Sequence, residues 1–339
     1  MPRRPPPKIA LVYPVNATRN AGNHVTAARW ASILRELGCG VRLLCAYDDR
    51  PYDALIALHA RRSAEAAARF RLRFPERPVI VGLAGTDLYG DLGRSAAARR
   101  CLESADRLVL LQREGLDSLP PALHAKTRVI EQSARATPRP PRRDARAFTV
   151  CVLGNLRHVK DPMRTAMAAR LLPPESRVRV VHAGRALDER YAELARREGA
   201  RNPRYRWMGE LDHAAARRLL ASSRLLVLSS RSEGGANVIS EALVDGVPIL
   251  AADIAGTRGI LGGDYPGLYP VGRTQALAAL LARAEGDPSF YARLVRACRR
   301  AAPLASRARE RKAWRALLAE LSLPTRTRRS ARRTTQCAG

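Results

Sequence analysis

Short apolar runs alternate with helix-like stretches along this chain, and the alternation occurs twice. The first series, within residues 8–130, consists of KIALVY, VRLLCA, DALIAL, PVIVGL, RLVLLQ and TRVI. The second series, within residues 148–253, consists of FTVCVL, RVRVVHAG, YRWMGE, RLLVLSS and VPILAAD. Strands that alternate with helices at this spacing are typical of parallel sheets with right-handed crossovers. The pattern predicts an α/β fold with two Rossmann-like domains.

The clearest helical pattern covers residues 24–37. Its apolar residues lie on one stripe and are Ala27, Trp30, Ala31, Leu34 and Leu37. Gly38 follows directly, and glycine is a common residue just after the end of a helix. This stretch is therefore predicted to be an amphipathic helix of the first domain.

The segment ATPRPPRRDAR at residues 136–146 is rich in proline and arginine, as interdomain linkers often are. It separates a predicted N-terminal domain, residues 1–140, from a predicted C-terminal domain, residues 147–304. A final helix-like run at residues 305–321 carries one tryptophan and three leucines, and it could pack back on the N-terminal domain. The tail at residues 322–339 is basic and lacks acidic residues, which predicts disorder.

Polar loops that contain glycine or basic residues follow five of the predicted strands. They are NATRNAGNH, HARRS and GTDLYGD in the first half, and GNLRHVKDP and RSEGGAN in the second. Open parallel sheets bind their ligands beyond the C-terminal ends of the strands. We therefore expect these five loops to line one cleft between the two domains.

The composition is that of a soluble globular protein, with 46% hydrophobic residues among 339. No apolar run approaches the roughly 18 residues of a membrane span, and no segment resembles a signal peptide. The six cysteines have no spacing of the kind that metal-binding or redox motifs use. We therefore expect a cytoplasmic protein with reduced thiols and no stable membrane anchor.

The formal net charge of +29 raises the possibility of a nucleic-acid partner. The arginines are scattered through the chain, however, and aromatic residues make up only 5%, which leaves few platforms for base stacking. An excess of cations also suits smaller anionic ligands such as nucleotide diphosphates. We expect no nucleic-acid ligand, although a basic binding module remains an alternative.

The run SEGGANVISEALVDGVPIL places Glu233 and Glu241 eight positions apart, on either side of a glycine pair. The glycines fall between a predicted strand and a predicted helix, where free backbone N–H groups favour an anion. Carboxylates are good acceptors for hydroxyl groups. A ligand with both a phosphate and vicinal hydroxyls, such as a sugar nucleotide, would use all of these groups, although a plain strand-turn-helix is the simpler alternative.

Three stretches together, RSEGGANVISEALVDGVPIL, LGNLRHVKDP and GTDLYGD, resemble GT-B glycosyltransferases of the glycogen-synthase-like group. The donor site of that group carries two glutamates separated by seven residues. The stretches GNHVTAARWASILRELG, ALHARRSAEAAARFR and GTDLYGDL more narrowly resemble the selenosugar synthases of selenoneine biosynthesis. The resemblance spans nearly the whole chain and implies a GT-B fold, with two Rossmann-like domains that face a central cleft.

The resemblance also implies roles for individual donor-site residues. Glu241 would bind the ribose hydroxyls of the nucleotide, Glu233 would hold the donor sugar, and Lys160 would neutralise the diphosphate. Lys160, Glu233 and Arg157 are the candidate catalytic residues. The remaining candidate donor-binding residues are Gly22, Asn23, Gly154, Asn155, Gly234, Gly235, Ala236 and Asn237.

The chain departs from the family pattern at two positions. Asn155 stands where relatives commonly have an arginine, and Arg157 is a candidate replacement for it. Ala84 stands before GTD, where many relatives have a histidine close to the reacting sugar. An acceptor that is already anionic has less need of that histidine.

Selenophosphate is an anionic acceptor that needs cations to position it. The candidate acceptor-binding residues lie on loops of the first domain and are Arg19, His24, His59, Arg61, Arg62, Thr86 and Asp87. Plainer interpretations also exist. Arg61 and Arg62 could be ordinary surface residues, His59 a structural histidine, and Asp87 a helix cap.

The predicted reaction moves a sugar, N-acetylglucosamine or glucose, from a UDP-sugar to selenophosphate and gives a 1-seleno-sugar. No Asp-x-Asp occurs in the sequence, so we expect Lys160 and Arg157, without a metal or another cofactor, to stabilise the leaving diphosphate. The resemblance implies functional links with a selenophosphate synthetase and a selenoneine synthase. The alternatives are a UDP-sugar-dependent transferase that acts on a lipid or natural-product hydroxyl, and the basic binding module.

Overall fold

Six parallel strands form the sheet of the first domain in the computed structural model, which describes residues 5–14 and 22–325. Their order across the sheet is β2-β1-β3-β4-β5-β6. Their bounds are β1 Lys8–Val12, β2 Gly40–Leu44, β3 Ala54–Leu58, β4 Val79–Gly82, β5 Arg107–Leu110 and β6 Thr127–Val129. All six predicted strands of the first half are present.

Helices cover both faces of this sheet. The predicted helix at residues 24–37 is present as α1, and its residues Ala27, Trp30 and Leu34 are buried. On the opposite face α2 and α3 pack around Phe70 and Leu102. The helices of this domain are α1 Gly22–Glu36, α2 Ala64–Arg73, α3 Ala96–Ser104, and the short η1 Asp87–Asp91, η2 Arg113–Ser118 and η3 Pro121–Lys126.

A second sheet of six parallel strands forms the other domain, in the order β12-β11-β10-β7-β8-β9. Five of these strands were predicted from their apolar runs. The sixth, β12, has only two residues and lies within the run DYPGLYPVG. Because this run is rich in proline and glycine, its composition indicates a loop and not a strand. The bounds are β7 Phe148–Leu153, β8 Val178–Ala183, β9 Tyr205–Trp207, β10 Leu225–Leu228, β11 Ile249–Ala252 and β12 Leu268–Tyr269.

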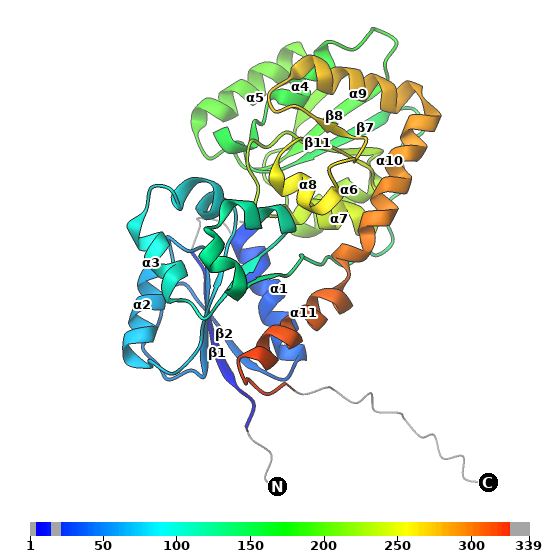
Figure 1. Ribbon diagram of the computed structural model, residues 1–339. Coiled ribbons are helices and arrows are strands. Elements are labelled where there is room, and N and C mark those ends of the chain that lie inside the picture. The colour runs from blue at the N-terminus through cyan, green and yellow to red at the C-terminus, as the bar shows by residue number, and fades with distance from the viewer. Residues whose placement is uncertain (1–4, 15–21, 326–339) are drawn as a thin grey trace, which may run out of the picture.

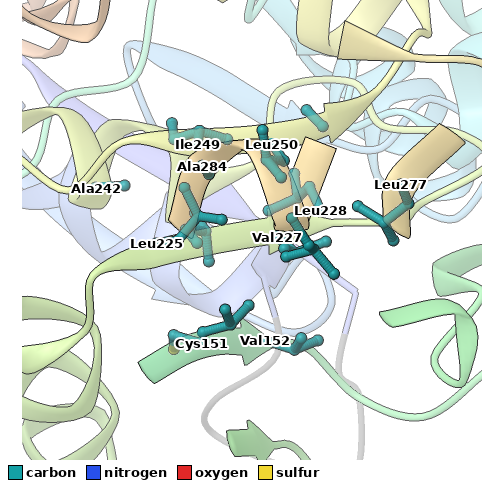
Figure 2. Close-up of a cluster of buried hydrophobic side chains, with 14 of the residues drawn as sticks. Cys151, Val152, Leu225, Val227, Leu228, Ala242, Ile249, Leu250, Leu277 and Ala284 are labelled. Carbon is teal, nitrogen blue, oxygen red and sulfur yellow. The ribbon is translucent and has the colours of Figure 1, made fainter. Parts of the chain in front are cut away.

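The core of the second domain lies between this sheet and its helices. Figure 2 shows Cys151 of β7, Val227 of β10 and Leu250 of β11 packed in successive strands, with Ala242 of α7 and Leu277 of α9 nearby. The helices of this domain are α4 Arg164–Arg170, α5 Glu189–Arg201, α6 His213–Ser222, α7 Asn237–Asp245, α8 Ala255–Leu261, α9 Thr274–Gly286, α10 Pro288–Ala301, and the short η4 His158–Lys160 and η5 Ala302–Ala305. The predicted fold class, two α/β domains with parallel sheets, is therefore confirmed.

The last helix, α11 (Arg307–Glu320), leaves the second domain and packs against α1 of the first (Figure 1). Trp314 meets Trp30 edge-on, with ring centroids 4.9 Å apart, and both side chains are fully buried. Leu317 and Leu318 join the same core cluster as Ile9. The chain thus crosses between the domains twice, at the linker after β6 and at the entry to α11.

A buried polar network joins the two domains beside these crossings. Glu310 of α11 is 1% exposed and accepts hydrogen bonds from Arg29 Nε at 3.1 Å and from the Ser133 backbone N–H at 2.8 Å. The Gln132 side-chain amide donates to the carbonyl oxygen of Gly235 in the second domain. Because these groups are buried, the loss of one partner would leave another unsatisfied, so the network favours one arrangement of the domains.

The described cysteines are free thiols, and Cys45 is the exposed one among them. Burial raises the pKa of the Cys39 thiol to about 11 and that of Cys101 to about 12. Within the described residues no helix combines the length and apolarity that a bilayer crossing needs. The predicted tail from residue 326 onward lies outside the described residues.

Candidate active site

The glycine turn after β10 brings Glu233 and Lys160 together. Lys160 Nζ contacts Glu233 Oε1 in an ion pair, and the Ser230 hydroxyl donates to the same carboxylate oxygen at 2.6 Å. The two side chains retain 24% and 12% of their exposure. Helix α7 begins at Asn237, just after the turn, so its first N–H groups lie at the same end of the sheet. A cation and a helix N-terminus therefore converge at one place.

The loop that carries Lys160 is fixed to the end of β10. The Ser229 hydroxyl donates to the carbonyl oxygens of Lys160 and Asp161, at 3.0 and 2.9 Å. The backbone N–H of Arg231 donates to Val159 O at 2.8 Å. These contacts hold the ammonium group beside Glu233, although the two residues are 73 positions apart in the sequence.

The Gly154–Asn155 loop lies next to Lys160. It packs so closely on Gly184 that a Cβ there would lie 1.9 Å from Gly154 O. His182 Nε2 donates to the same oxygen at 3.2 Å, while its Nδ1 lies 3.1 Å from the Tyr205 hydroxyl. Complete burial lowers the pKa of His182 to about 4, so the imidazole is neutral at physiological pH. The hydrogen bond from His182 to Gly154 therefore helps to hold the Gly154–Asn155 loop in place.

Asn155 and Arg157 take different positions in that loop. The Asn155 side-chain oxygen accepts a hydrogen bond from the Arg185 backbone N–H at 3.1 Å. Arg157 is exposed, and among the described residues its guanidinium has no ion-pair partner. The arginine proposed as a replacement is thus available to a ligand, and its role stays a prediction.

Glu241 lies one turn into α7, and its side chain is 14% exposed. Its Oε1 lies 3.4 Å from His213 Nε2 and 3.9 Å from Arg217 Nη1. The hydrogen bond to Glu241 raises the pKa of His213. The two glutamates of the motif therefore pair with different basic residues. Glu233 pairs with Lys160, and Glu241 lies beside His213 and Arg217 of α6.

The N-terminal end of α1 reaches the start of α7 from the other domain. The Asn237 side-chain oxygen accepts from Arg29 Nη1 at 2.6 Å, and its amide lies 3.4 Å from the Gly22 carbonyl oxygen. His24 Nδ1 lies 3.1 Å from the Tyr13 hydroxyl. The predicted donor residues Gly22 and Asn237 are thus brought together across the domain boundary.

The two domains meet closely at Gly85 and Gly234. A Cβ on Gly234 would lie 2.6 Å from the backbone of Ala84 and Gly85, and a Cβ on Gly85 would lie 2.4 Å from Gly234 N. Gly85 also has φ of 121°, a conformation that other residues rarely adopt. Only glycine at these two positions permits this contact, which places the loop after β4 directly over the glycine turn that follows β10.

His59 is buried beneath that loop. It has φ of 78°, is 1% exposed, and its Nε2 lies 3.0 Å from the exposed Thr86 hydroxyl. The backbone N–H of Arg62 donates to its Nδ1 at 3.4 Å, which places the proton on Nε2. Burial lowers the pKa of His59, which therefore acts as a neutral support for Thr86.

Asp87 is fully buried, and its carboxylate is occupied by backbone groups. One oxygen accepts from the N–H groups of Ala84 and Gly85, at 2.8 and 2.9 Å, and the other from Ala60 N–H at 2.9 Å. Asp87 therefore ties the loops after β3 and β4 together and is not free to contact an acceptor directly; the capping interpretation is wrong as well, because the N-cap of the short helix is Thr86. Arg61 is exposed and pairs with Asp91 at 2.8 Å. Arg19 lies outside the described residues.

Sequence reasoning missed several residues of this site. Ser230 and His213 contact the two glutamates, but neither stands in a recognisable motif. Gly85 could have been recognised from the sequence as a turn residue, since it is a glycine that follows a strand and precedes a polar turn. No three described His, Cys, Asp or Glu side chains are placed to hold a metal ion together.

The two facing parallel-sheet domains, with the glycine turn between them, define the GT-B class of glycosyltransferase. The family described as "Glycosyl transferases group 1" matches residues 134–301. The matched residues cover most of the second domain. The match supports the expected glycosyltransferase class, and the selenosugar specificity stays a prediction.

Solved structures agree on the fold. Anabaena HepE in complex with UDP is 16% identical, with a TM-score of 0.72 over 93% of this chain and 100% of that chain. Sucrose-phosphate synthase from Thermosynechococcus elongatus is 15% identical, with a TM-score of 0.77 over 93% and 99%. A glycosyltransferase from Rickettsia africae is 12% identical, with a TM-score of 0.68 over 94% and 99%. A comparison with curated protein sequences gives no significant match.

Proposed function

We propose that this protein transfers a sugar from a UDP-sugar to selenophosphate and so forms a 1-seleno-sugar. The observation that carries the proposal is the convergence of Lys160, Glu233 and the first turn of α7 beneath the Gly85 loop. That geometry supplies donor groups for a diphosphate on one side and an acceptor loop on the other.

The UDP-sugar part is supported by the donor side of the cleft. HepE, which shares the fold, is described in complexes with UDP and with UDP-glucose. In this chain Glu241 would accept the ribose hydroxyls and Glu233 would accept those of the sugar. Lys160 would exchange part of its contact with Glu233 for the diphosphate oxygens, because two phosphates offer more negative charge than one carboxylate.

Bond breaking leaves negative charge on the departing diphosphate. The Lys160 ammonium and the free N–H groups at the start of α7 are fixed before reaction, so they stabilise that charge without rearrangement. Arg157 is exposed at the edge of the same loop and would add a second cation. Glu233 would then orient the sugar so that its anomeric carbon faces the Gly85–Thr86 loop.

The acceptor side is consistent with an anionic nucleophile. Ala84 offers no base, and His59 is buried, neutral and bound to Thr86. A selenophosphate selenium is already anionic, so no proton has to be removed before it attacks the anomeric carbon. The C–Se bond forms as the C–O bond to UDP breaks, UDP leaves with the electron pair, and water later cleaves the P–Se bond to release phosphate.

Mass spectrometry of reactions that pair UDP-N-acetylglucosamine or UDP-glucose with selenophosphate tests the proposal. We expect a selenium-containing sugar whose isotope pattern depends on both substrates. The Lys160→Ala variant should form much less, whereas Arg100→Gln, an exposed change on α3, should match the wild type. Sugar transfer to an added lipid or natural-product hydroxyl, with no selenium product, would favour the alternative transferase instead.

A further inference from the structure

The residue after Lys160 adopts a backbone conformation that is rare outside glycine. Asp161 has φ of 44° and ψ of 57°, in the left-handed region. It ends the short helix η4, and its backbone N–H donates to His158 O at 3.0 Å. Aspartate tolerates this conformation better than most residues do, but it is still strained there. Such strain persists only where the surrounding contacts hold the residue in place.

Two arginines from different segments hold the Asp161 carboxylate. Arg164, at the start of α4, places Nε 3.0 Å from Oδ2 and Nη2 3.4 Å from Oδ1. Arg231, just after β10, places Nη2 3.5 Å from Oδ2. The side chains of Asp161 and Arg164 are only 13% and 14% exposed, so solvent screens their attraction less than that of a surface pair. The carboxylate therefore joins the loop after β7 to the turn after β10.

The turn after β10 also carries Glu233, the ion-pair partner of Lys160. Arg231 lies two positions before Glu233 in the sequence. The Ser229 hydroxyl donates to the carbonyl oxygens of Lys160 and Asp161, so backbone contacts reinforce the side-chain link. Asp161 thus fixes the backbone beside Lys160 to the same turn that presents Glu233.

We propose that Asp161 is a positioning residue, which holds the Lys160 ammonium group where the diphosphate of a UDP-sugar binds. This role rests on the proposed function, which assigns Lys160 to the diphosphate. Asp161 touches no substrate and acts through Lys160. Without the carboxylate, the loop is free to leave the left-handed conformation, and Lys160 moves with it. A misplacement of about 1 Å can cost about 100-fold in rate, so the loss of this anchor is measurable.

The Asp161→Asn variant tests the carboxylate without changing the backbone preference. Asparagine keeps the size of the side chain and tolerates the left-handed conformation, but it removes the charge that the two arginines share. We expect kcat for UDP-sugar consumption with selenophosphate to fall by roughly tenfold or more. UDP affinity, measured by calorimetry, should fall by roughly threefold or more, because a charge-assisted contact with the diphosphate is weakened.

The same change in the Lys160→Ala background separates positioning from general destabilisation. Residues coupled through a shared backbone shift do not contribute additively, so Asp161→Asn should alter kcat and UDP affinity by less than about twofold once Lys160 is absent. Equal losses in both backgrounds would show that Asp161 acts independently of Lys160, and they would overturn the proposal. Wild-type kcat and UDP affinity in the single variant Asp161→Asn would overturn it as well.

The matched control is Glu285→Gln, on α9 of the same domain. The Glu285 side chain is also 13% exposed, lies 3.8 Å from Arg177 Nε and accepts from the Ser176 hydroxyl at 2.7 Å. These contacts lie beside the start of β8, at the opposite end of the second sheet from Lys160. The control should therefore keep kcat and UDP affinity within about twofold of the wild type. A loss equal to that of Asp161→Asn would mean that any such carboxylate matters, and it would overturn the proposal.

This proposal and the proposed function fail in different ways. A wild type that binds UDP but forms no selenium product would overturn the proposed acceptor, and the comparison of UDP affinities would still decide the role of Asp161. A wild type that forms the selenium product but shows equal losses in both backgrounds would overturn only the role of Asp161. A wild type that does not bind UDP would overturn both.

Discussion

Replacement of Gly234 by alanine separates the domains by a predictable amount. The added carbon would lie 2.6 Å from the Ala84 carbonyl group and the Gly85 nitrogen, whereas ordinary contacts begin near 3.4 Å. The atoms in the way are backbone, so no side chain can rotate to make room. The loop after β4 must therefore move away from the glycine turn after β10 by about 1 Å, a displacement that can cost about 100-fold in rate.

The assay is kcat/KM for UDP-sugar consumption with selenophosphate present. We expect Gly234→Ala to lower it by about 100-fold, which corresponds to about 2.7 kcal/mol of transition-state stabilisation. UDP affinity should change less, because the second domain is intact. Small-angle scattering of the UDP-bound variant should indicate a less compact molecule.

The matched control is Gly93→Ala, in the first domain. A Cβ at Gly93 would meet no atom within 4 Å, so this variant should keep the activity and compactness of the wild type. If Gly234→Ala retained wild-type kcat/KM, contact between the two glycines would not be needed for the reaction, and the proposed role of the loop after β4 as the acceptor side would be wrong.

Three further predictions concern the second domain. Glu241→Ala should weaken UDP binding by roughly 1.5–3 kcal/mol, because the hydrogen bonds to the ribose are lost. Glu233→Ala should slow UDP-sugar turnover and leave UDP affinity nearly unchanged. An equal loss of UDP affinity in both variants, measured by calorimetry, would reject this division of roles. Lys160→Ala should raise the activation barrier of sugar transfer by roughly 2–4 kcal/mol. Wild-type UDP affinity should be the same in a chelator as in magnesium. A strict metal requirement would contradict the stabilisation of the diphosphate by Lys160. His182 has a folded pKa of about 4, below its value of about 6.5 when unfolded, so stability falls as pH drops through this window, by about 2 kcal/mol at pH 5. The urea midpoint should therefore fall less steeply between pH 7 and 5 in His182→Gln, and identical slopes would contradict the assignment.

The strands and the main helices could be predicted because local apolar patterns determine them. KIALVY and FTVCVL are buried on both faces of a parallel sheet, so their continuous apolar runs are visible without any tertiary information. The two-residue strand β12 could not be found, because its hydrogen bonds to β11 depend on the fold and not on its composition.

The glycine turn could be predicted for the same local reason, since SEGGAN lies between a strand and a helix. The partners of its glutamates could not. His213 and Glu241 are 28 positions apart, and only the packing of α6 against α7 brings them within 3.4 Å. Asp87 was placed in the right loop, but its direction toward the backbone of Ala60 depends on how two loops meet.

Phosphorus-31 NMR of a mixture of protein, UDP-sugar and selenophosphate tests the central claim most directly. Glycosyl transfer at this cleft predicts that UDP appears as selenophosphate disappears, in equal amounts, and that neither change occurs when one substrate is left out. A UDP-sugar signal that stays constant with selenophosphate present, or UDP release that is independent of it, would contradict the account.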